Sequence, residues 1–144
     1  MRRLSVMVAG LWWASLCTVG FLVVPMLFVH LPTPAVAGGM AAKLFSAQTW
    51  VSAICGLFLL MSGASSRNVG HPRVGPQSAS HALMWILAAL IASLLLEFAV
   101  APHIVARENL KFWHGAGSGL YLVQCVCTGF IFWKTLPTQV QRAT

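Results

Sequence analysis

Four long runs of apolar residues, separated by short polar segments, dominate the pattern along the 144-residue chain. Each run holds about 20 residues or more, and a helix that rises about 1.5 Å per residue needs about that many to cross the hydrocarbon core of a bilayer. Strands of a membrane barrel would alternate apolar and polar residues, which these runs do not do. The pattern therefore predicts four transmembrane helices, over residues 4–29, 41–61, 81–101 and 112–136.

The segments between the runs are short, which favours an all-α, up-down bundle of four transmembrane helices in one membrane domain, residues 1–144. Pro25 predicts a kink or a loosened turn in the first helix. The proline- and glycine-rich residues 30–39 predict an outside loop, and residues 62–80 predict a mobile cytoplasmic loop because they lack a hydrophobic period. The first run is longer than the apolar core of a cleaved signal peptide, about 7–15 residues, so we expect a retained helix.

Composition agrees with the membrane assignment. Hydrophobic residues make up 58% of the chain and charged residues 8%, against about 25% charged residues in soluble domains. Mean hydropathy is +0.81. A soluble domain of this size could not bury so much apolar surface.

The formal net charge of +7 reflects basic residues that lie at the ends and in the connections. Under the positive-inside rule, their distribution places both termini and residues 62–80 in the cytoplasm of a cell with a bacterial inner membrane. We expect a lipid bilayer as the surroundings and no nucleic-acid partner. The expected inner side carries six basic residues and the outer side three: Arg2, Arg3, Arg67, Arg73, Lys134 and Arg142 against Lys43, Arg107 and Lys111.

Small residues at a spacing of four mark the helix faces that we expect to pack. In lipid, small side chains let helix backbones approach closely, and dispersion then holds the helices together. The same property suits contacts with other membrane helices or with a second copy of the chain. The predicted packing residues are Ser52, Gly56, Ala89, Ser93, Gly115 and Gly119.

Glu97 is the only acidic residue within a predicted span. It continues the stripe of Ala89 and Ser93, so it is expected to face the bundle interior, because a carboxylate at mid-membrane costs on the order of a few kcal/mol. Polar residues at the same depth of the other helices predict an outer-leaflet polar pocket around Glu97. Its candidate members are His30, Gln48, His103, His114, Ser118 and Tyr121.

Two interpretations of these polar residues stay open. Hydrogen bonds from Glu97 could simply join helices, or the residues could bind an ion or a small ligand. For a metal site, His30, His103, His114 and Met26 would suit copper, but no tight histidine spacing fixes a geometry. The histidines lie near helix ends, which does not favour haem, and the four cysteines include no CxxC. We therefore expect no cofactor.

The chain has no nucleophile elbow, phosphate-binding loop or pair of carboxylates, so we do not expect an enzyme. The favoured function is an accessory or structural membrane subunit with a polar pocket at Glu97. The alternative is an ion, metal or small-molecule binding or transport protein that uses Glu97 and the outer histidines.

Three segments carry a resemblance to a known family: "GLWWASLCTVGFLVVPMLF", "AAKLFSAQTW" and "APHIVARENLKFWHGAGSGLYLV". With them the chain resembles the bacterial four-span proteins of the family DUF4149, a domain of unknown function, which are similar to a eukaryotic four-span family. The usual His-Gly-x-Ser spacing is altered here, because two residues separate Gly115 from Ser118. The resemblance implies a four-helix inner-membrane protein and brings no established activity.

Overall fold

The computed structural model describes residues 2–68 and 76–136, which form helices and contain no strand. Within those residues, four helices are long and apolar enough to cross a membrane: Arg3–His30, Pro34–Gly63, Ala82–Val105 and Leu110–Thr135. The prediction of four transmembrane spans is therefore confirmed by the length and the apolar composition of these helices. The elements in chain order are α1 (Arg2–Cys17), η1 (Thr18–Val23), α2 (Val24–His30), α3 (Pro34–Asn68), α4 (Pro76–Leu95), η2 (Leu96–Val100), α5 (Ala101–Val105) and α6 (Leu110–Thr135), where η marks a π-helical segment.

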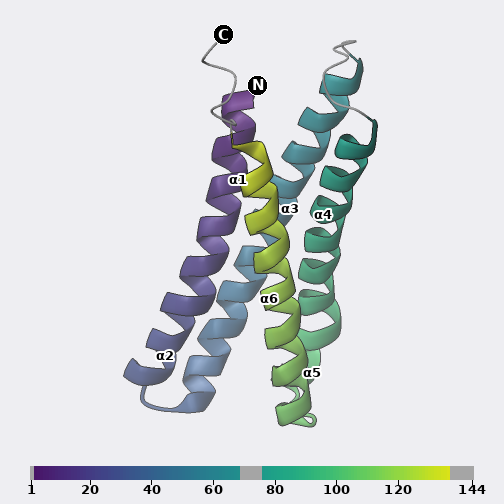
Figure 1. Cartoon of the computed structure of the whole chain (residues 1–144). Helices are drawn as coiled ribbons and strands as arrows, with labels where there is room; N and C mark the ends of the chain where they lie inside the picture. The colour runs from purple at the N-terminus through teal and green to yellow at the C-terminus, as the bar shows by residue number, and fades with distance from the viewer. Residues whose placement is uncertain (1, 69–75, 137–144) are drawn as a thin grey trace.

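The helices run up and down in a four-membered bundle (Figure 1). α1 and α4 each pack against both α3 and α6. The connections α2–α3 and α5–α6 lie together at one end of the bundle. We call the half of the bundle at that end, residues 18–46 and 96–118, the hairpin half, and the rest the terminal half.

α3 is longer than its sequence-based bounds of 41–61, because it begins at Pro34. The Val36 backbone N–H donates a hydrogen bond to Thr33 Oγ1 (3.3 Å). Threonine before the first turn and proline at the first position are typical of a helix start. Most of the expected outside loop at residues 30–39 is therefore helix.

The expected loop at residues 62–80 is also shorter than predicted. α3 continues to Asn68 and α4 begins at Pro76, again with proline at the first position. Residues 69–75 of this loop, which was predicted to be mobile, lie outside the described residues.

Both π-helical segments end two residues before a proline. The Val24 N–H donates to Val19 O, and the Ala101 N–H donates to Leu96 O, five residues back in each case. Pro25 and Pro102 follow. Because a proline ring clashes with the carbonyl four residues earlier and offers no N–H, a wider turn accommodates it inside the span.

Beyond these segments the bundle divides into two pairs. α2 packs against α3, whereas η2 and α5 pack mainly against α6 and make fewer contacts with α3. Figure 1 shows α2 beside the start of α3 and away from the start of α6. No residue of η1 or α2 is buried. The terminal half is therefore a closed four-helix core, whereas the hairpin half consists of two helix pairs that touch through the contacts of α3 with η2 and α5.

Candidate functional site

Ser52 is the centre of a buried hydrogen-bond network in the terminal half. Its Oγ accepts hydrogen bonds from Trp12 Nε1 on α1 (3.0 Å) and from Gln124 Nε2 on α6 (2.9 Å). Trp12 and Ser52 are 0% exposed. One hydroxyl on α3 thus joins three helices where neither water nor lipid reaches it.

Gln48 extends this network by one turn. Its Nε2 donates to Ser15 Oγ (3.0 Å), and that hydroxyl donates to Trp12 O (2.9 Å). Gln48 is buried. The sequence placed Gln48 beside Glu97 in an outer pocket, whereas the structure uses it to join α3 to α1.

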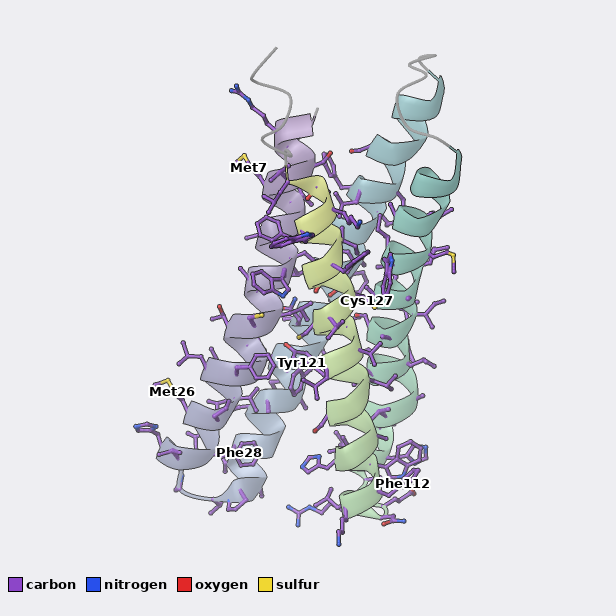
Figure 2. All side chains as sticks on the ribbon, viewed as in Figure 1. Met7, Met26, Phe28, Phe112, Tyr121 and Cys127 are labelled. Atoms are coloured by element: carbon purple, nitrogen blue, oxygen red, sulfur yellow. The ribbon has the colours of Figure 1, made fainter. Side chains whose placement is uncertain are left out.

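Tyr121 lies on the side of α6 that faces α1 (Figure 2). Its hydroxyl donates a hydrogen bond to Leu16 O (2.8 Å). Its ring meets Phe45 of α3 edge-on, with centroids 5.2 Å apart. Tyr121 is therefore a buried helix-joining residue in the structure.

Glu97 lies in η2 and is half-buried. Ser46 of α3 donates a hydrogen bond to its Oε1 (2.7 Å). Within residues 2–68 and 76–136, the one ion pair is His103 with Glu108, so no basic side chain there pairs with Glu97. The carboxylate bridges the two helix pairs of the hairpin half through one neutral donor.

His114 and Ser118 are exposed, although they share a stripe of α6 with two buried residues. Tyr121 and Cys125 continue that stripe at helical spacing and are buried in the terminal half. The stripe loses its cover where α1 and α2 leave α6 to follow α3. The structure therefore gives α6 an uncovered polar strip at His114 and Ser118.

The other two histidines of the predicted pocket make contacts with residues other than Glu97. His30 hydrogen-bonds through Nδ1 with Met26 O of its own helix (3.0 Å). His103 pairs with Glu108 (2.7 Å) and stacks on the Trp113 ring, with centroids 4.1 Å apart.

Across the described part of the chain, no three His, Cys, Asp or Glu residues are grouped so that they could hold a metal ion. Met26, the proposed sulfur ligand, is exposed and points away from the bundle (Figure 2). The predicted pocket residues are thus distributed over several separate contacts.

The predicted packing residues also divide into two groups. Ala89, Ser93 and Ser52 are buried, and a Cβ added at Gly56 would lie 2.6 Å from Leu90 Cδ2. In contrast, a Cβ at Gly115 or Gly119 would meet no atom within 4 Å. These two glycines face away from the neighbouring helices.

Gly117 was not among the predicted packing residues, yet it packs inside the bundle, as does Gly129 of the same helix. Gly117 is buried, and a Cβ there would lie 3.2 Å from Val100 Cγ1. The four-residue spacing selected Gly115 and Gly119, but spacing alone does not say which face of a helix meets a neighbour.

Comparison with known proteins gives a family and no activity. No curated protein and no solved structure matches the chain. The sequence model of one family, described as Domain of unknown function (DUF4149), matches residues 7–112, more than half of the 144 residues. The matched region includes Trp12, Ser46, Ser52 and Glu97 and ends within the first turn of α6. The chain therefore belongs to the DUF4149 family.

Proposed function

We propose that this protein is a non-enzymatic accessory subunit of the bacterial inner membrane that binds a helix of another membrane protein through its hairpin half. In this proposal Glu97 supplies the polar contact. The positive-inside distribution favours cytoplasmic termini, and the hairpin half then lies in the outer leaflet.

The observation that carries the proposal is that, among the residues the structure describes, Glu97 accepts one hydrogen bond, from the neutral Ser46 hydroxyl. An acidic residue at the centre of a span costs about 3 kcal/mol, whereas one hydrogen bond between membrane helices contributes about 0.6 kcal/mol on average. Ser46 alone therefore offsets a small part of that cost. A partner helix that offers a basic or hydrogen-bonding side chain would offset more of it.

The uncovered strip of α6 supports the same proposal. His114 and Ser118 are exposed on a helix that is long and apolar enough to cross the membrane, and a Cβ added at Gly115 beside them would meet no atom within 4 Å. A second helix could approach such a surface closely because small residues do not hold it off. His114 and Ser118 could then bond with polar groups of the partner.

An ion or small ligand at Glu97 is the second candidate, because the carboxylate could accept a cation in place of a partner side chain. Its support is weaker, since His30 and His103 are engaged in contacts of their own. A helix partner also uses the strip of α6, which a small ion would leave exposed.

The test is site-specific photocrosslinking in native membranes. A benzophenone amino acid replaces Ser118 on the uncovered strip or, as a control, Val126, which is 66% exposed on the same helix. We expect a protein adduct of discrete mass from position 118 and none from position 126. Glu97→Leu is expected to reduce the adduct about tenfold, which corresponds to a loss of about 1.4 kcal/mol.

Glu108 provides a matched control, because the chain has only two acidic residues. Glu108→Gln removes the exposed one, and we expect the adduct to persist. Adducts with lipid only at position 118, or an adduct that is indifferent to Glu97→Leu in folded protein, would overturn the proposal. Elemental analysis of the same purified protein tests the second candidate, which requires a bound ion that Glu97→Leu removes.

A further inference from the structure

α1 and α6 pack against each other in opposite directions, and their glycines show which positions face each other. A Cβ added at Gly10 would lie 3.1 Å from the Phe132 ring. Three positions further along α1 and three positions back along α6, a Cβ added at Gly129 would lie 2.9 Å from Trp13 Nε1. One step forward on α1 therefore corresponds to one step back on α6, as two antiparallel helices require.

Cys17 and Cys125 take the next facing positions in this alignment. Cys17 lies four residues after Trp13, and Cys125 lies four residues before Gly129. Each cysteine is therefore one helical turn further along the face that contacts the other helix. In agreement with this alignment, the Cys17 side chain interacts with that of Cys125.

The alignment continues on the other side of the two cysteines. Three residues after Cys17, a Cβ added at Gly20 would overlap the Tyr121 ring, which lies four residues before Cys125. The Tyr121 hydroxyl donates to Leu16 O (2.8 Å). The two thiols thus lie between two contacts of the same helix pair, where glycines let the backbones approach closely.

The two thiols differ in how far they are covered. All four cysteines of the chain are free. Cys125 is 6% exposed, whereas Cys17 is half-buried in a helix that is long and apolar enough to cross the membrane. A lipid-soluble oxidant therefore meets Cys17 first, and Cys125 is placed to react with it afterwards.

We propose that Cys17 and Cys125 form a reversible redox pair that a lipid-soluble quinone oxidises to a disulfide. The Cys17 sulfur adds to the quinone ring while its proton passes to a quinone oxygen, so no free thiolate has to exist in apolar surroundings. The Cys125 sulfur then attacks the Cys17 sulfur and displaces the quinone as in thiol–disulfide exchange. The S–S bond forms, the bond from sulfur to the ring breaks, and the proton of Cys125 passes to the second oxygen.

The electrons and protons of this reaction balance. Two thiols lose two electrons and two protons, and the quinone takes them up and leaves as the quinol. A disulfide requires Cα atoms no more than about 7 Å apart, which close packing at glycines favours. This inference goes beyond the proposed function and does not depend on a partner helix.

The bond would join the first and the last helix where the closed core ends. η1 begins at Thr18, directly after Cys17, and beyond it α2 packs against α3. A disulfide at this point prevents α1 from separating from α6 in the terminal half. Oxidation therefore fixes the boundary between the two halves of the bundle.

The test counts free thiols in purified protein reconstituted in vesicles of phosphatidylethanolamine and phosphatidylglycerol. The vesicles are incubated with decylubiquinone, the protein is denatured, and a maleimide–polyethylene glycol shifts the chain once for each free thiol. We expect the count to fall from four to two, and dithiothreitol to restore both. The mass of the chain should fall by two hydrogen atoms, and peptide mapping should find residues 17 and 125 joined.

Cys17→Ser and Cys125→Ser each remove one partner, and both variants should keep their three remaining thiols. Cys127→Ser is the matched control, because it removes a buried thiol two positions away on α6 and should leave one free thiol after oxidation. Four free thiols after treatment, a stable quinone adduct, a bond that includes Cys55 or Cys127, or a bond only between two chains would overturn the inference. The unaltered protein gives the main result, so the test does not depend on the folding of a variant.

Discussion

Ser52→Ala tests whether one hydroxyl holds three helices together. The change removes a single oxygen atom, leaves the helix backbone intact and introduces no new atoms. It withdraws the acceptor from Trp12 Nε1 and from Gln124 Nε2. Gln124 is 2% exposed and Trp12 is 0% exposed, so water cannot replace the lost partner without a rearrangement of the core.

The expected loss follows from two hydrogen bonds. At about 0.6 kcal/mol for an average bond between membrane helices, the free energy of unfolding falls by about 1.2 kcal/mol. If both bonds are of the strongest kind measured, about 1.7 kcal/mol each, the loss is about 3.4 kcal/mol. Two buried donors left without an acceptor place the result toward the upper part of this interval, because such groups cost about 1–3 kcal/mol.

The measurement is reversible unfolding of purified protein in mixed micelles with increasing dodecyl sulfate, followed by circular dichroism. Ser118→Ala is the control, since it removes an exposed hydroxyl from the neighbouring helix and should change the free energy of unfolding by less than about 0.5 kcal/mol. A Ser52→Ala protein as stable as Ser118→Ala would refute the reasoning. It would mean that Trp12 and Gln124 find other acceptors.

Two further predictions concern packing and orientation. Gly56→Ala should lower the free energy of unfolding by about 1–3 kcal/mol, because its Cβ would lie 2.6 Å from Leu90 Cδ2 and 2.9 Å from Cγ, while Gly119→Ala should be neutral because its Cβ meets nothing within 4 Å. Equal losses in the two variants, measured by the same unfolding assay, would contradict this packing. For orientation, a membrane-impermeant maleimide should label a cysteine at Lys111 in intact inner-membrane spheroplasts, and a cysteine at Arg3 only after permeabilisation. The opposite pattern would show that the termini lie outside.

The spans could be predicted from the sequence because span length depends only on the number of consecutive apolar residues. The buried positions of Ala89 and Ser93 could also be predicted, since they lie in a regular part of α4 where a spacing of four keeps one face. The start of α3 was missed although its signal is local. Thr33 followed by Pro34 is a helix-start pattern, but the proline and glycine content of the segment favoured a loop.

The contacts of Glu97 could not be predicted in the same way. A helical wheel assumes about 100° for every residue, and η1 and η2 each break that rule within the predicted pocket. Which helix pairs with which beyond the π turns depends on tertiary packing. That packing leaves His114 exposed and brings Gln48 and Tyr121 into hydrogen bonds with α1. The spacing of residues within one helix does not specify such contacts between helices.

The hydrogen bond from the Tyr121 hydroxyl to the Leu16 carbonyl of α1 has a consequence for the order of assembly. The chain is synthesised from its N-terminus, so the first span enters the membrane before the last one exists. Until α6 arrives, the Leu16 carbonyl has no tyrosine from which to accept this hydrogen bond, because Tyr121 is the only tyrosine of the chain. The first helix to be made is therefore the last to reach its final hydrogen bonding, and it does so only when the fourth helix docks.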